Sequence, residues 1–72
     1  MNWSVEVNGE TMQAEIEGVR IEADGEDARK FASSVAEVSP YLGMVAGDEI
    51  AGEAAELVEA LQLAASEVVI NG

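Results

Sequence analysis

Carboxylates are the most numerous of the side chains that could do chemistry in this chain, and Ser, Thr, Tyr41 and three cations are the others. The 72 residues include 15 Asp and Glu but only three Lys and Arg, a formal net charge of −12, with no His and no Cys. The chain therefore lacks an imidazole base, a thiolate nucleophile and the usual ligands of zinc. Acid–base catalysis would need a carboxylate pair, drawn from Glu10, Glu15 and Glu17 or from Glu53 and Glu56.

Such a pair works only when one carboxyl group is buried and its pKa is raised. The sequence pattern instead places these glutamates on solvated faces, and a serine nucleophile would have only Lys30 or a carboxylate as its base. We therefore expect no enzymatic activity and no cofactor.

Two short segments resemble ligand-binding motifs without completing them. Asp24-Gly25-Glu26-Asp27 is rich in oxygen donors, but an EF-hand loop spreads its ligands over about 12 residues and closes with a bidentate Glu. Gly43 to Gly47 lacks the Lys and Ser/Thr that follow a phosphate-binding loop. We expect no specific metal site, and we interpret the acidic segment as the start of a helix.

The first third of the chain has the alternating pattern of β-strands. Trp3, Val5 and Val7 alternate with polar residues, and Asn8-Gly9 is the strongest short signal for a two-residue type I′ turn. This turn would set Val5 opposite Met12 and place the apolar residues of both strands on one face.

A second turn is predicted at Glu17-Gly18. It sets Ile16 opposite Val19 and Glu15 opposite Arg20, as an ion pair on the polar face. A slip of one residue would bury carboxylates, so the pattern favours this register. The predicted three-stranded antiparallel meander spans about residues 2–8, 10–17 and 19–23.

The rest of the chain is predicted to be helical. Asp24 and Asp48 are candidate N-caps, and Ser39-Pro40 is expected to end one helix and begin a short one. The predicted helices span about residues 25–38, 40–46 and 49–66. Residues 67–71 either continue the last helix or form a short fourth strand, because Val68, Val69 and Ile70 are β-branched.

The apolar sheet face and the apolar helix stripes must cover each other. We therefore predict an α+β fold of two layers, with the helices packed on one face of the sheet, in a single small acidic domain over residues 1–72. Leu63, Val69 and Ile70 fall outside the main stripe of the last helix and are candidates for self-association, and we also expect Tyr41 and Met44 to be partly exposed.

The charge itself predicts the kind of partner. So few cations argue against direct binding to nucleic acid or to an anionic membrane, whereas carboxylates repeated along a strand or helix resemble a phosphate backbone in their spacing. We expect the chain to block a basic, nucleic-acid-binding protein by charge mimicry, as a phage or mobile-element inhibitor of a host defence system would. The candidate contact residues are Glu6, Glu15, Glu17, Glu22, Glu49, Glu53, Glu56 and Glu59.

The alternative is a small structural or oligomeric subunit, such as a virion component, whose acidity serves solubility or adaptation to salt. The first residues have neither the basic start nor the apolar run of a signal peptide, and no stretch is apolar enough to span a bilayer. We expect the protein to act in the cytoplasm, which is the host cytoplasm if it is viral.

Overall fold

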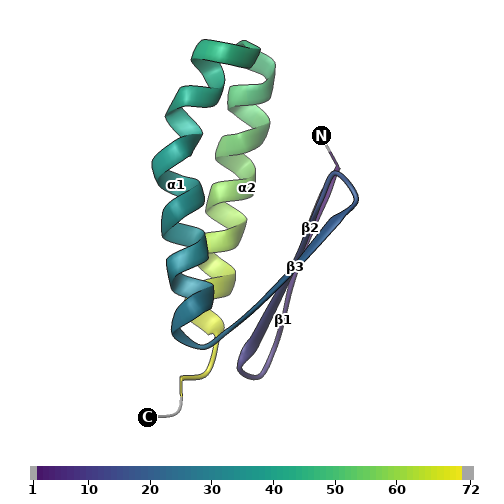
Figure 1. Ribbon diagram of the computed structural model, residues 1–72, viewed down its shortest axis with the longest axis vertical. Helices are drawn as coiled ribbons and strands as arrows, with labels where there is room; N and C mark the ends of the chain where they lie inside the picture. Colours follow the sequence, from purple (N-terminus) through teal and green to yellow (C-terminus); the bar gives the residue numbers. More distant parts are fainter. Residues whose placement is uncertain (1, 71–72) are drawn as a thin grey trace.

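The computed structural model describes residues 2–70, which form an antiparallel sheet followed by a helical hairpin (Figure 1). The elements are β1 (Trp3–Asn8), β2 (Thr11–Ile16), β3 (Val19–Asp24), α1 (Glu26–Ala46) and α2 (Asp48–Glu67). The strands pair in the order β1-β2-β3, and both helices pack on the same face of the sheet. The predicted α+β fold with a three-stranded meander is confirmed.

The first turn lies one residue later than predicted. Asn8 pairs with Thr11, so Gly9 and Glu10 form the two-residue loop, and Val5 lies opposite Ala14 rather than Met12. Only the first loop residue, Gly9, has a positive φ (64°), as in a type II′ turn. The pairing has moved by two residues, and a shift of two keeps every side chain on its predicted face.

The second turn is as predicted. Glu17 (φ 50°) and Gly18 (φ 82°) both have positive φ, as a type I′ turn requires, and Ile16 pairs with Val19. The strained Glu17 is held by Asn2. The Glu17 amide donates to the Asn2 carbonyl (2.8 Å), and the Asn2 amide donates to Oε1 of Glu17 (3.2 Å).

The predicted break at Ser39-Pro40 is wrong, because α1 runs without interruption through Pro40 to Ala46. Proline has no amide hydrogen, so the carbonyl of Ala36 loses its usual partner. Tertiary packing compensates for this loss. Gly43 lies so close to α2 that a β-carbon there would come within 3.0 Å of the Ala51 Cβ. The helices predicted over 25–38 and 40–46 are thus one helix, which packs closely against its neighbour at Gly43.

The two predicted N-caps are also wrong. The N-cap residues are Gly25 and Gly47, and neither helix start has a side-chain cap. Asp24 instead ends β3, where its Oδ1 accepts a hydrogen bond from the Thr11 hydroxyl (2.7 Å). The carboxylate expected to cap the helix therefore accepts a cross-strand hydrogen bond instead.

The segment after α2 turns back to the sheet without joining it as a strand. Val68 is extended (φ −65°, ψ 129°) and buried, and the amide of Val69 donates to the Gly9 carbonyl in the β1–β2 turn (3.0 Å). Through residue 70 no fourth strand forms, and residue 71 of the predicted strand lies outside the described residues.

The core between the layers is small. α2 contacts β1 and β2, while α1 contacts β3. Within residues 2–70, six of the ten buried hydrophobic residues are Ala, and Met12 and Leu61 are the largest side chains that are fully buried. Trp3, Phe31 and Val35 pack partly buried around this centre. The stability of the fold therefore depends on a few large side chains.

Two leucines of α2 provide a matched test of this core. Leu61 is 0% exposed and Leu63 is 64% exposed. We expect Leu61→Ala to lower the free energy of unfolding by about 2–5 kcal/mol, because it leaves a cavity. Leu63→Ala should change it by no more than about 0.5 kcal/mol. Urea unfolding followed by circular dichroism measures both, and equal losses would contradict the assigned core.

Candidate functional site

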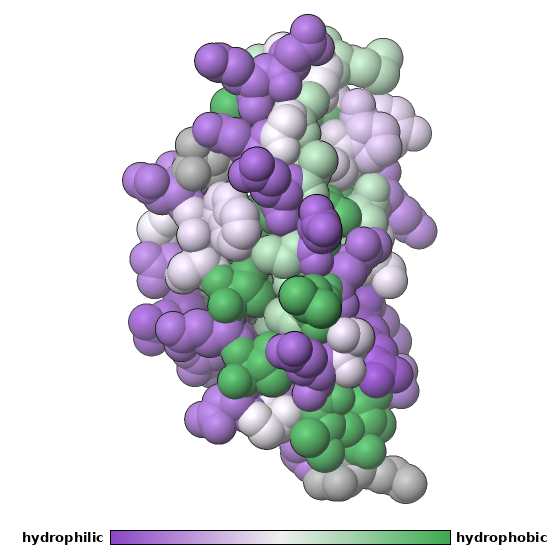
Figure 2. Space-filling view, turned by 180° about the vertical axis from the view of Figure 1, so that it is seen from behind, coloured by the Kyte–Doolittle hydropathy of each residue, from purple (hydrophilic) through white to green (hydrophobic). Residues whose placement is uncertain are grey.

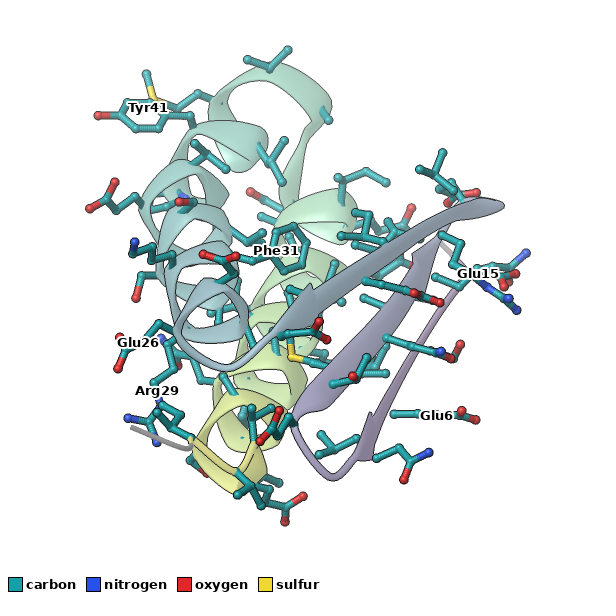
Figure 3. The ribbon with its side chains drawn as sticks, turned by 60° about the horizontal axis from the view of Figure 1, so that its bottom comes forward. Glu6, Glu15, Glu26, Arg29, Phe31 and Tyr41 are labelled. Carbon is teal, nitrogen blue, oxygen red and sulfur yellow. The ribbon has the colours of Figure 1, made fainter. Side chains whose placement is uncertain are left out.

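The outer face of the sheet, which points away from the helices, is a polar grid. Its rows follow the strand register, and Figure 3 shows Glu6 and Glu15 projecting outward from it. The three rows are Ser4–Glu15–Arg20, Glu6–Gln13–Glu22 and Asn8–Thr11–Asp24. Four carboxylates and one cation therefore lie on this face.

Neighbouring strands hold most of these carboxylates in place. The Thr11 hydroxyl donates to Asp24, and Nε2 of Gln13 donates to Oε1 of Glu22 (3.0 Å). Each is a cross-strand pair, worth roughly 0.2–1 kcal/mol. Two carboxylates of the grid are thus occupied by partners on β2.

The predicted pair of Glu15 and Arg20 also forms, with 4.0 Å between Oε2 and Nη2. Both side chains are more than half exposed (52% and 67%), so water screens the attraction and its contribution to stability is small. Beside the pair is a shallow hollow of about 150 Å³. Its lining consists of Ser4, Glu6, Gln13, Ala14, Glu15 and Arg20.

The second acidic surface is α2. This helix contains six carboxylates and no Lys or Arg. Glu49, Glu53 and Glu56 follow one another at i, i+4 and i+7 on one side, and Glu59 lies one turn further. All of these are exposed except Glu53, which is half-buried. Glu49, Glu56 and Glu59 form no hydrogen bond or ion pair with any other described residue.

The eight predicted contact residues therefore divide between two surfaces. Glu6, Glu15 and Glu22 lie on the outer sheet face, and Glu17 lies exposed in the turn at its end. α2 packs on the opposite face of the sheet, so Glu49, Glu53, Glu56 and Glu59 cannot lie on the same flat surface as the sheet residues. The outer sheet face carries its own cation and internal partners, whereas the α2 surface has no cation.

The residues predicted for self-association differ in their exposure. Leu63 is 64% exposed, on the same side of α2 as Glu56 and Glu59, and Val69 is 50% exposed after the helix. Ile70 is half-buried beside Val69.

The larger apolar surface is at the end of α1, where Tyr41 and Met44 are exposed as expected. Sequence reasoning missed Val38, Leu42 and Val45, which are exposed as well. The signal was present in the run from Val38 to Gly47, which has no charged residue.

A further hollow lies between the two helices. A groove of about 280 Å³ between the helices is open and lined by Arg29, Ala32, Ser33, Gln62, Ala65 and Ser66. Within residues 2–70, no three acidic side chains come together as metal ligands would. Over the same residues, neither helix has an apolar stretch of the length needed to cross a lipid bilayer.

Comparison with protein-family models, with curated proteins and with solved structures finds no match for this chain. What remains is the class that the fold and the surfaces define. It is a small acidic α+β protein that presents carboxylates on one face of a sheet and on one helix.

The uneven distribution of charge should make the stability of the protein depend on salt. Because α2 has six carboxylates and no cation, screening should raise the free energy of unfolding by about 1 kcal/mol between 10 mM and 0.5 M NaCl. Glu56→Lys, which places a cation within reach of Glu53 and Glu59, should stabilise the protein at low salt and have less effect at high salt. Urea titrations at both salt concentrations test this, and stability that is independent of salt would contradict it.

Proposed function

We propose that this chain is a non-enzymatic binding module that blocks a basic, nucleic-acid-binding protein. Its carboxylates would occupy the surface on which that protein binds the phosphates of the nucleic acid. The observation that supports this function best is the row of acidic residues on α2. Six carboxylates lie within 20 residues without one cation, and Glu49, Glu56 and Glu59 have no partner among the described residues. Uncompensated charge of this kind attracts a basic surface and accelerates encounter with it.

The spacing of the α2 carboxylates suits this role. Between Glu49 and Glu59 the members of the row are three or four residues apart. One carboxylate therefore occurs about every 4.5–6 Å along the helix axis. A strand of DNA carries one phosphate about every 3.4 Å of axis. The helix thus has a charge density of the same order as a nucleic-acid strand.

The helix that carries the row is fixed before a partner arrives. Leu57 and Leu61 bury its opposite side against the sheet, and the two are 5% and 0% exposed. A backbone that is already ordered loses little conformational freedom on binding, so more of the electrostatic attraction is retained as affinity.

The outer sheet face is the weaker candidate for the contact. Asp24, Glu22 and Glu15 already interact with Thr11, Gln13 and Arg20. A basic partner would have to displace these neighbours before it could use the carboxylates fully. We therefore assign the main contact to Glu49, Glu53, Glu56 and Glu59, and a supporting contact to the sheet. The partner is a cytoplasmic DNA- or RNA-handling protein, as expected of an inhibitor of a host defence system.

Displacement of DNA tests this function. Fluorescence anisotropy would follow a labelled duplex bound to each of a panel of purified DNA-binding enzymes with basic grooves, while the protein is added at 50 mM and 300 mM NaCl. We expect release of the duplex from at least one enzyme, weakened strongly at the higher salt because the contacts are ionic. Poly-glutamate at equal total charge is the control. Release from no enzyme, or equal release by poly-glutamate, would contradict the proposal.

Two triple variants with equal changes in charge then identify the surface. Glu49→Gln, Glu56→Gln and Glu59→Gln together should weaken displacement by at least about tenfold. Glu6→Gln, Glu15→Gln and Glu22→Gln together should weaken it by no more than about threefold. An equal loss in both would show that total charge matters and the α2 row does not.

A further inference from the structure

Residues 2–70 leave more large apolar side chains exposed than they bury. Eight of these residues are exposed, whereas four of the buried hydrophobic residues are larger than Ala, namely Met12, Leu57, Leu61 and Val68. Small domains need most of their large apolar residues in the core, because their cores are marginal even then. In residues 2–70 alone, several large apolar side chains that could be buried therefore stay in contact with water.

Much of this exposed apolar surface forms one face of α1. Val38, Tyr41, Leu42 and Val45 stand at i, i+3, i+4 and i+7, which places them on the same side of the helix. We name these four residues the α1 tip face. They are 55%, 63%, 38% and 86% exposed.

The α1 tip face continues a stripe that the sheet covers lower down. Val35 and Phe31, one and two turns before Val38, pack against the core, and Figure 3 shows Phe31 between α1 and the sheet. In Figure 1 the closed end of the helical hairpin extends beyond the sheet. The stripe therefore loses its cover where the sheet ends, although its apolar pattern continues.

The charge pattern indicates what covers it. Residues 38–47 contain no charged residue in a chain of net charge −12. A basic partner has nothing to pair with here and would be drawn to the carboxylates elsewhere in the chain. On the face drawn in Figure 2, hydrophilic side chains surround the apolar ones. The occupant must be apolar, and a second copy brings a matching stripe of the same length.

We propose that the α1 tip face is the interface of a homodimer with twofold symmetry. The two α1 helices cross antiparallel, so that Leu42, in the middle of the face, lies near the axis and meets its own copy, while Val38 meets Val45 of the other copy. Ala32, Ala36 and Gly43 are on the side of α1 towards α2, roughly opposite this face. The dimer therefore leaves both α2 helices exposed for a basic partner.

The dependence of the dimer on salt distinguishes it from binding to a basic partner. Two copies of charge −12 repel each other, so dimerisation should strengthen as NaCl rises from 20 to 500 mM, whereas an ionic complex weakens. Sedimentation velocity from 1 µM to 1 mM of the protein should show twice the monomer mass, reached at lower concentration in the higher salt. A monomer over this whole range would overturn the proposal.

Two exposed positions test the surface. Val45→Glu should weaken dimerisation at least about tenfold, because it places two carboxylates in the interface. Leu63→Glu, at an exposed residue of α2 away from this face, should change it less than about twofold. Circular dichroism controls for folding, which neither change should disturb at such exposed sites. Dimerisation lost in Leu63→Glu but retained in Val45→Glu would overturn the proposal.

Cross-linking tests the symmetry, since the chain has no cysteine of its own. Leu42→Cys should form a disulfide-linked dimer on oxidation with copper–phenanthroline, whereas Ser33→Cys, exposed on another side of α1, should remain mostly monomeric. A mixture of Val38→Cys and Val45→Cys chains should cross-link better than either chain alone. Equal yields from Leu42→Cys and Ser33→Cys would overturn this geometry.

Discussion

The interior of this protein accepts no charge, and this constraint determines where its fifteen carboxylates lie. Within residues 2–70 no charged or polar side chain is buried, and of the acidic residues only Glu53 is even half-buried. With a core built mainly from alanines, an unpaired buried carboxylate would cost more than the few large side chains could offset. The faces that the strands and helices turn to solvent, and with them the two acidic surfaces, follow from keeping these groups in water.

The same constraint explains which parts of the fold are predictable from the sequence. Alternation along the strands and the stripe of Leu57 and Leu61 define the buried faces, and the Glu17-Gly18 turn follows because a slip would bury charge. The first turn is mispredicted because a shift of two residues buries the same side chains, so the pattern cannot distinguish the two registers. The local signal for a helix break at Ser39-Pro40 is wrong because α1 packs against α2 and continues. The local signal for a cap at Asp24 is wrong because this carboxylate accepts a hydrogen bond from the Thr11 hydroxyl.

The candidate surfaces are predictable in composition but not in arrangement. The carboxylates of the sheet and of α2 could be assigned to solvent from periodicity. Their separation, however, depends on which face of the sheet the helices cover. The exposure of the end of α1 depends on the length of this helix relative to the length of the strands. Strands of six residues extend about 20 Å, whereas a helix of 21 residues extends about 31 Å. The length of α1, and therefore its extension beyond the sheet, can be predicted from the sequence only if the helix is known to continue through Pro40.

We propose that a basic partner binds mainly to α2 and makes only a supporting contact with the sheet. The most direct measurement is a two-dimensional NMR titration of the ¹⁵N-labelled protein with an oligolysine peptide at 20 mM NaCl. We expect the amide signals from Glu49 to Glu59 to shift first and furthest, and those of Glu6, Gln13 and Glu22 to move little. Larger shifts on the sheet, or equal shifts on both surfaces, would contradict it.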